Sequence, residues 1–232
     1  IKSGKHLTPR NIIQMIWEIS GVEEGKTIVD PACGVGGFVL EGLNYPYEFN
    51  PLNYKAIGID RADEMIIVSK ANMVLHLLDK FYNTNDNDRV KLAKKINQTF
   101  LHAKNNGTGT LGELESHVEN NSEFRTKITA DFVFANVPFY TNGVSQIDAS
   151  LADLGFANFY DNSGLGVESR FLKYIVGLVN KGDPGLAFVI VTDGILRRHL
   201  DKARSMLNFY TDILGIISLP EGIFQNNNWK TS

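Results

Sequence analysis

The sequence predicts an α/β fold, a mostly parallel sheet flanked by helices, and three observations carry this prediction. Short apolar segments alternate with helical patterns along the chain, which is typical of parallel strands joined by right-handed crossovers. The segment 186–191 is apolar throughout, as a central parallel strand is. The chain has 232 residues, of which 43% are hydrophobic and 21% are charged. This is ordinary globular composition for one α/β domain or at most two small ones.

The first helix is expected after Thr8 and Pro9, with Thr8 as its N-cap and Pro9 at its first helical position. Ile12, Ile13 and Ile16 then follow helical spacing. Further helices are expected at 36–43, 62–80, 168–180 and 201–210, and strands at Thr27–Asp30, 54–59, 98–103, 131–135, 186–191 and 213–219.

Between these elements, the segments 105–129 and 141–166 lack clear periodicity, and we expect them to be long loops. The polar tract 83–88 is expected to be a solvated turn. Ligands of parallel sheets bind at the carboxyl ends of the strands. The functional residues should therefore follow the predicted strands directly.

Composition excludes several classes of protein. The single cysteine, Cys33, excludes an internal disulfide framework and a multi-cysteine metal site. No apolar run is long enough to span a bilayer. The five histidines show no metal-ligand spacing, so no metal site is expected: His6, His76, His102, His117 and His199. The net charge of −3 gives no general attraction to nucleic acid.

Any binding to DNA would therefore depend on a local patch or on another chain. The most basic local cluster contains Arg197, Arg198, Lys202 and Arg204. An ordinary solvated helix face is the preferred interpretation of this cluster, and phosphate contacts beside a cleft are the alternative.

The sharpest local signal is the glycine-rich segment 31–38, which we call the glycine loop. It follows the strand Thr27–Asp30 and precedes a helix. Glycines allow a tight turn and close approach of a ligand to the backbone. Asp60 ends the next strand, where a carboxylate can accept hydrogen bonds from ribose hydroxyls. The two features together predict a cofactor that contains a nucleoside.

The chemistry of the segment narrows the choice of cofactor. The glycine spacing fits neither the dinucleotide fingerprint nor the phosphate-binding loop. A carboxylate at Asp30 would repel a pyrophosphate but suits a cationic ligand, such as the amino-acid end of S-adenosylmethionine. Cys33 lies inside the turn, and we expect it to pack there rather than act as a nucleophile.

The second signal is Asn136, Val137, Pro138 and Phe139, which follow the strand at 131–135. In combination with the glycine loop, this segment resembles the Asn/Asp/Ser-Pro-Pro-Tyr/Phe/Trp motif of the DNA methyltransferases that modify adenine N6 or cytosine N4. Tyr140 could extend an aromatic wall there or pack within its loop.

The chain as a whole resembles the adenine-N6 methyltransferase domain of the modification subunit of type I restriction-modification systems. His6 to Arg10 resembles the family's Phe/Leu-Thr-Pro-Arg segment, and Asp30 to Phe38 matches its Asp-Pro-Ala-Cys-Gly-Ser-Gly-Gly-Phe at all but one position. Similar segments follow in the same order along the whole chain.

The resemblance implies the class I S-adenosylmethionine-dependent methyltransferase fold, which is Rossmann-like. It further implies S-adenosylmethionine as cofactor, double-stranded DNA as substrate, separate specificity and restriction subunits as partners, and a cytoplasmic location. Residues 1–232 would be the catalytic domain, a fragment of a longer chain without its amino-terminal helical region, final strand and carboxy-terminal tail.

Site residues are carried over motif by motif. The resemblance implies that the cofactor is bound by Thr8, Pro9, Asp30, Pro31, Ala32, Gly34, Gly36, Gly37, Phe38 and Asp60. It implies that Asn136, Val137, Pro138 and Phe139 form the catalytic segment. One departure is Val137, which stands where the family has its first proline. Another is Asn105 or Asn106, which stands roughly where an acidic residue that contacts the adenine of the cofactor is expected.

The expected mechanism uses Asn136 as a hydrogen-bond acceptor for the adenine amine, with the backbone carbonyl of residue 137 as the second acceptor and Phe139 stacked on the base. One alternative is a methyltransferase that acts on RNA or on a protein amide. Another is a catalytically impaired assembly subunit that only binds the cofactor, an alternative that Val137 keeps open. A nicotinamide-dependent dehydrogenase fits least, because its glycine spacing is absent.

Overall fold

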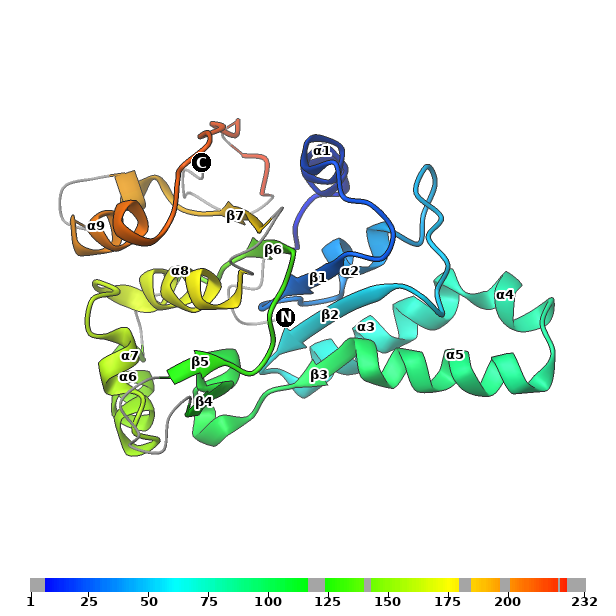
Figure 1. The fold of residues 1–232 in the computed structure, drawn as a ribbon, viewed down its shortest axis with the longest axis horizontal. Coiled ribbons are helices and arrows are strands. Elements are labelled where there is room, and N and C mark those ends of the chain that lie inside the picture. The colour runs from blue at the N-terminus through cyan, green and yellow to red at the C-terminus, as the bar shows by residue number, and fades with distance from the viewer. Residues whose placement is uncertain are drawn as a thin grey trace.

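The computed structural model describes residues 7–116, 124–139, 143–179, 185–196, 201–220 and 222–224. Its main sheet has the strand order β3-β2-β1-β6-β7, and each pair of neighbours in it is parallel (Figure 1). The strands are β1 (Thr27–Asp30), β2 (Lys55–Asp60), β3 (Phe100–His102), β6 (Phe132–Asn136) and β7 (Leu186–Ile190). The predicted α/β fold with a mostly parallel sheet is therefore confirmed.

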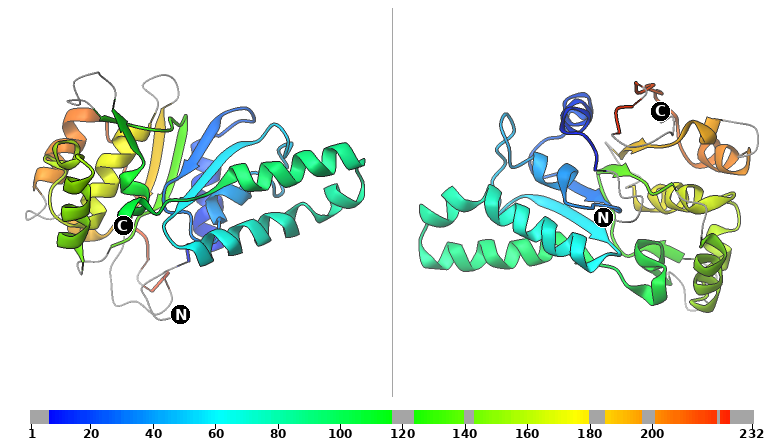
Figure 2. Two further views of the ribbon diagram at one scale, coloured as in Figure 1. Left: turned by 90° about the horizontal axis from the view of Figure 1, so that it is seen from below. Right: turned by 180° about the vertical axis from the view of Figure 1, so that it is seen from behind.

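Helices cover both faces of this sheet (Figure 2). One face carries α1 (Arg10–Ser20), α2 (Gly37–Glu41), α3 (Asp63–His76) and α5 (Asp86–Thr99). The other carries α6 (Val144–Asp153), α7 (Ala157–Tyr160) and α8 (Gly166–Leu178), and α9 (Asp201–Tyr210) packs on α8.

The alternation of side chains along β6 explains why both faces are covered. Phe132 and Phe134 belong to the core on the α1 side, whereas Val133 and Ala135 belong to the core on the α8 side. Successive side chains of a strand point to opposite faces, so an apolar strand needs an apolar layer on each side. The sheet is thereby fixed in the middle of the domain.

The first helix forms where the sequence predicts it, but its start differs by one residue. Pro9 is the N-cap, with φ −57° and ψ 141°, and no side chain caps the helix. Thr8 is therefore not the N-cap, and its hydroxyl instead accepts a hydrogen bond from the Asn136 amide. The helix ends at Gly21, whose φ of 61° is the left-handed conformation that favours glycine.

The predicted helix 62–80 is interrupted. α3 ends at His76, Leu77 has φ −102° and ψ 5°, and the short α4 (Leu78–Tyr82) follows. The side chain of Leu77 is 2% exposed. The break therefore places a large apolar side chain in the core, a tertiary contact that helical periodicity does not encode.

The predicted solvated turn at 83–88 is wrong in its second half, because α5 begins at Asp86. The side chain of Asn85 accepts a hydrogen bond of 3.0 Å from the backbone N–H of Asp88 and so caps this helix. α5 is strongly polar and buries Leu92, Ile96 and Thr99. Its apolar stripe is too narrow for periodicity to reveal it.

The two segments expected to be long loops contain regular structure. The first holds η1 (Asn105–Gly107), η2 (Gly109–Gly112) and an antiparallel pair formed by β4 (Leu114–Ser116) and β5 (Phe124–Thr126). The second holds α6 and α7. These elements are short and pack against the α8 side of the sheet, so tertiary contacts rather than local pattern stabilise them.

The strand expected at 213–219 is not present. Residues 211–220 form no strand, and Ile213, Leu214, Ile216 and Ile217 are exposed. Apolar and β-branched residues form a strand only where a neighbouring strand offers hydrogen-bonding groups. The remaining strands agree with prediction to within two residues at each end, and β1 agrees at both ends.

Parallel pairing brings the carboxyl ends of β1, β2 and β6 to one edge of the sheet. Asp30, Asp60 and Asn136 are the last residues of these three strands. The polar side chains that the sequence singles out therefore share one edge, as expected. Among the helices in the described ranges, none combines the length and apolarity that a bilayer crossing needs.

Candidate active site

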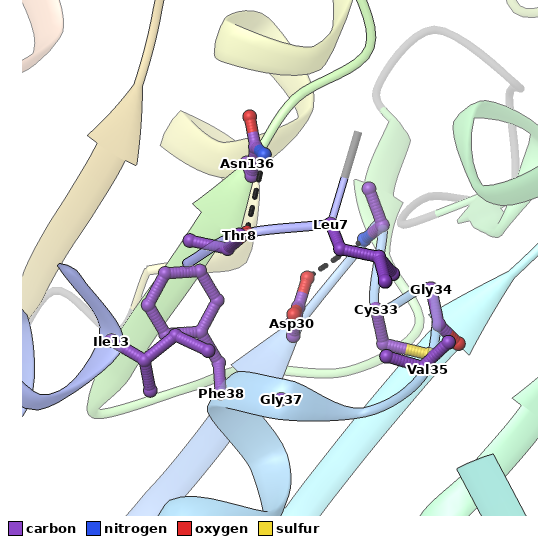
Figure 3. A pocket seen from close by; sticks show the side chains of 11 residues that line it. Leu7, Thr8, Ile13, Asp30, Cys33, Gly34, Val35, Gly37, Phe38 and Asn136 are labelled. Carbon is purple, nitrogen blue, oxygen red and sulfur yellow. Dashed lines mark hydrogen bonds between the residues drawn. The ribbon is translucent and has the colours of Figure 1, made fainter. Parts of the chain in front are cut away.

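A cavity of about 60 Å³ opens at this carboxyl edge (Figure 3). It lies between the segment before α1, the end of β1, the glycine loop and the end of β6. Its lining consists of Leu7, Thr8, Ile13, Asp30, Ala32, Cys33, Gly34, Val35, Gly37, Phe38 and Asn136. Residues that are 128 positions apart in the chain thus face one space.

The glycine loop needs glycine for two different reasons. Gly34 has φ 52°, and a Cβ atom placed on it would meet nothing within 4 Å, so the backbone here faces open space. Gly36 has φ 87°, and a Cβ atom there would lie 2.9 Å from the ring of Phe100. Positive φ and close packing both exclude other residues at Gly36, while Gly34 leaves its backbone accessible to a ligand.

The loop is fastened by side chains from three other elements. One oxygen of Asp60, at the end of β2, accepts a hydrogen bond of 3.0 Å from the Gly34 N–H. The Thr110 hydroxyl of η2 donates to the carbonyl of Pro31 at 2.7 Å, and the Asn72 amide of α3 donates to the carbonyl of Val35 at 3.0 Å. Such long-range bonds fix the loop before any ligand binds.

The second oxygen of Asp60 accepts a hydrogen bond of 2.8 Å from the Ala62 N–H. Asp60 therefore holds both the glycine loop and the residue that precedes α3 by hydrogen bonds. A carboxylate oxygen has more than one lone pair, so these two bonds leave acceptor capacity for a ribose hydroxyl.

Asp30 is the buried acid of the cavity. Its side chain is 2% exposed, and burial raises its pKa to about 8. The hydrogen bond from the Ala32 N–H lowers the pKa, while the nearby charge of Asp60 raises it further. A cationic group beside Asp30 would offset this desolvation cost and restore the carboxylate.

Cys33 packs as expected. It is 5% exposed, and burial raises the pKa of its thiol well above the ordinary value. A Cβ atom on Gly58 would lie 2.9 Å from the Cys33 side chain. The thiol therefore fills the space between the loop and β2.

On the opposite side of the cavity, Asn136 ends β6, opposite Ile190 of β7 in the sheet. Its side-chain nitrogen donates a hydrogen bond of 3.1 Å to the Thr8 hydroxyl (Figure 3). Val137 is 1% exposed and belongs to the core on the α8 side. Pro138 and Phe139 are partly buried. Tyr140 lies outside the described residues.

Seven of the residues predicted for the site line the cavity: Thr8, Asp30, Ala32, Gly34, Gly37, Phe38 and Asn136. The other seven lie next to it in the chain or support it from behind: Pro9, Pro31, Gly36, Asp60, Val137, Pro138 and Phe139. Sequence reasoning missed the lining residues Leu7, Ile13 and Val35 and the loop anchors Asn72 and Thr110. No local pattern marks these anchors, because their partners are distant in the chain.

Asn105 does not face the cavity. Its side-chain nitrogen donates to the carbonyl of Gly109 at 3.0 Å and to the carboxylate of Glu113, so the amide is turned into its own loop. The side chain of Asn106 lies outside the described part of the structure. The amide of Asn105 is therefore engaged within its own loop.

The basic cluster is described only in part. Lys202 is exposed on α9, and Arg204 donates to the carbonyl of Ile195 at 3.4 Å. Arg197 and Arg198 lie outside the described residues. Within the described ranges, no three or more His, Cys, Asp and Glu side chains gather in a way that could hold a metal ion.

Comparison with known proteins agrees with this geometry. Residues 1–232 match the model of the family described as N-6 DNA Methylase. The chain belongs to this family. It is also 24% identical over 233 residues to the methylase subunit of the type I restriction enzyme MjaVIII from Methanocaldococcus jannaschii, a match that covers 99% of this chain.

Two solved structures share the fold of this N-6 DNA methylase chain. A modification subunit of a putative type I restriction enzyme from Vibrio vulnificus YJ016 superposes with a TM-score of 0.69 at 20% identity, over 99% of this chain. A putative class I S-adenosylmethionine-dependent methyltransferase from Listeria monocytogenes superposes with a TM-score of 0.55 at 17% identity, over 100%. The expected class I methyltransferase fold is thereby confirmed.

The chain spans only part of each of these proteins. It covers 31% of the Methanocaldococcus subunit, 44% of the Vibrio chain and 60% of the Listeria chain.

Proposed function

We propose that this chain carries the catalytic domain of an S-adenosylmethionine-dependent DNA methyltransferase that modifies N6 of adenine, as the modification subunit of a type I restriction-modification system. One observation carries the proposal. A single cavity joins a glycine loop with a buried acid to Asn136, in a chain that matches the N-6 DNA methylases along its whole length.

The residues of the cavity fit the cofactor. Asp30 offers a buried carboxyl to the cationic amino-acid end of the cofactor. An anionic phosphate in the same place would be repelled by the ionised carboxylate. Gly34 leaves the loop open to close approach, and Asp60 stands at the end of the adjacent strand for the ribose. Bound S-adenosylmethionine supplies an electrophilic methyl group on a sulfonium.

Asn136 then prepares the nucleophile. The amine of adenine is a poor nucleophile because its lone pair is delocalised into the ring. The side-chain oxygen of Asn136 and the backbone carbonyl of Val137 accept hydrogen bonds from the two amine hydrogens and draw the nitrogen toward sp³ geometry. Asn136 is thus an acceptor and an orienting group, not a general base.

Phe139 completes the proposed base site. A target base within duplex DNA has to leave the stack before its amine can reach the cavity. Phe139 is partly buried beside Asn136 and would stack on the extruded base.

Val137 does not prevent this arrangement. The proposed role at this position belongs to a backbone carbonyl, which every residue has. The valine side chain is buried in the core, so packing holds the segment where the family uses the rigidity of proline. The alternative of an impaired assembly subunit is therefore not favoured. A measurement of methyl transfer by the full-length protein tests this alternative as well.

The proposed partners are double-stranded DNA and the separate specificity and restriction subunits of such a system. Membership of the family and the similarity to a type I methylase subunit support these partners. The net charge of −3 is consistent with phosphate contacts made largely by other segments or subunits.

The test is methyl transfer from labelled S-adenosylmethionine to unmethylated host DNA by the full-length protein with its partner subunits. We expect label in N6-methyladenine at a defined site. Label in RNA, protein or cytosine would contradict the proposed substrate, and cofactor binding without any transfer would favour the assembly subunit.

A further inference from the structure

Thr8 contacts the functional amide directly. Its hydroxyl oxygen accepts a hydrogen bond of 3.1 Å from the side-chain nitrogen of Asn136, across 128 positions of sequence. In Figure 3 the amide oxygen of Asn136 lies on the side away from Thr8. The two side chains face the same cavity. The segment before α1 therefore reaches the end of β6 and holds the amide by its nitrogen end.

The chemistry of the substrate requires this orientation. An amide offers an acceptor at its oxygen and donors at its nitrogen. The adenine amine presents hydrogens, so only the oxygen of Asn136 can serve it. The nitrogen then needs an acceptor elsewhere, and a hydroxyl oxygen beside it supplies one. An amide without such a partner could rotate and present its donors to the amine.

We propose that Thr8 is a positioning residue that holds the Asn136 amide with its oxygen directed to the substrate amine. This inference rests on the proposed function. The family resemblance already implies that Thr8 contacts the cofactor. Under this inference Thr8 would also hold the Asn136 amide on the substrate side of the cavity.

The position of Thr8 is itself well determined. Pro9 follows it, and a residue before proline is restricted to extended conformations. The carbonyl of Pro9 accepts hydrogen bonds from Ile12 and Ile13 at 3.0 and 3.2 Å, which joins the segment to α1. Ile12 and Ile13 are buried in the core. Thr8 is therefore held by a packed helix and does not depend on a ligand for its placement.

The test compares Thr8→Val with Thr8→Ser in the full-length protein with its partner subunits. Valine keeps the shape of threonine but removes the acceptor, whereas serine keeps the hydroxyl. The single-turnover rate of methyl transfer is measured at saturating cofactor and DNA, and the affinity for S-adenosylmethionine is measured by calorimetry. We expect Thr8→Val to lower the rate about threefold to tenfold, which is the effect of one lost hydrogen bond. Thr8→Ser keeps the hydroxyl and should transfer the methyl group at close to the wild-type rate. Thr8→Val should also weaken cofactor affinity to the extent that the hydroxyl contacts the cofactor, and saturating cofactor keeps this effect out of the measured rate.

Thr126→Val is the control for the loss of a threonine hydroxyl. The hydroxyl of Thr126 donates to the carbonyl of Ile128 at 2.8 Å, and Thr126 does not line the cavity. We expect this variant to keep both the cofactor affinity and the rate at saturation close to wild type. A rate that falls in Thr8→Val alone would then be specific to the hydroxyl beside Asn136.

Three results would overturn the inference. If Thr8→Val weakens cofactor binding but reaches the wild-type rate at saturation, Thr8 only binds the cofactor. If Thr8→Ser is as slow as Thr8→Val, the hydroxyl is not responsible. If the wild-type complex transfers no methyl group to adenine, the proposed function fails and the inference fails with it. The first two results leave the proposed function intact.

Discussion

The two loops that face the cavity are built in different ways. The glycine loop after β1 is tied down through its own backbone, by Asp60, Thr110 and Asn72 from three separate elements. At the end of β6 the important feature is a side chain, Asn136, whose amide nitrogen donates a hydrogen bond to the Thr8 hydroxyl. A fixed backbone suits the binding of a cofactor, whereas we propose that the amide held by Thr8 orients the reacting amine. Changes at the first loop should therefore alter cofactor affinity, and changes at the second should alter turnover.

The strongest test of this contrast is Asn136→Ala, which removes the proposed acceptor. Loss of one group that orients or stabilises the reacting centre costs about a hundredfold or more in rate, so we expect a single-turnover rate reduced by at least that factor. Calorimetry should show S-adenosylmethionine affinity close to wild type.

The surface variant Asn97→Ala is a control, because Asn97 is exposed on α5 and its oxygen accepts from Lys70. It should behave as wild type in both measurements. An Asn136→Ala protein that lost cofactor affinity but transferred methyl groups normally at saturation would reverse the assignment of the two loops.

Asp60→Ala should have the next largest effect, this time on affinity. It removes the bond to the Gly34 N–H and the proposed bond to the ribose. Each hydrogen bond to a charged group is worth roughly 1.5–3 kcal/mol, so affinity should fall about tenfold to a hundredfold. Calorimetry measures the affinity, and Asp79→Ala, an exposed acid of α4, is the matched control. Equal affinity in the Asp60 variant and the wild type would remove Asp60 from the binding site.

Asp30 should make cofactor binding depend on pH. The carboxyl has a pKa of about 8 in the free protein, so at lower pH it is protonated and must lose its proton to pair with the cofactor's ammonium. Affinity should then rise up to about tenfold per pH unit toward pH 8. It should fall at higher pH, because a free α-amino group itself loses its proton near about 7.7–8.0.

Calorimetry at pH 6 in buffers with different ionisation enthalpies should detect the proton released on binding, and Asp30→Asn should abolish this release. A cofactor affinity that stays constant with pH below 8 would show that no cation pairs with Asp30.

The raised pKa of Asp30 also affects the stability of the folded protein. The stability associated with Asp30 is fully present below its ordinary pKa of 3.8 and is lost as the pH rises through about 8.

The smallest expected effect belongs to Val137→Pro. Proline fixes φ and lowers the backbone entropy cost of the loop by about 1 kcal/mol, so the methyl-transfer rate should rise a few-fold. Part of the buried valine packing is lost, so thermal unfolding should show a slightly less stable protein. If wild type transfers no methyl group and Val137→Pro restores full transfer, the impaired assembly subunit is the correct reading of the family resemblance.

Local patterns in the sequence were enough to predict the fold class, the position of β1 and the three polar residues at the strand ends. A buried run such as Thr27–Asp30, stopped by Pro31 and followed by glycines, is a local signal that needs no other part of the chain. The meeting of Asp30, Asp60 and Asn136 at one edge followed from a general rule of parallel sheets. These predictions succeeded because each depends on neighbouring residues or on fold topology.

The remaining features arise from packing in the folded protein. Packing breaks the helix at Leu77, stabilises the polar helix α5 and leaves 213–219 without a strand partner in the described residues. It also brings Asn136 to Thr8 and raises the pKa of Asp30. Each of these features depends on burial or on a partner far away in the chain. Contacts of that kind set the energy of a side chain or segment without leaving a pattern in the residues around it.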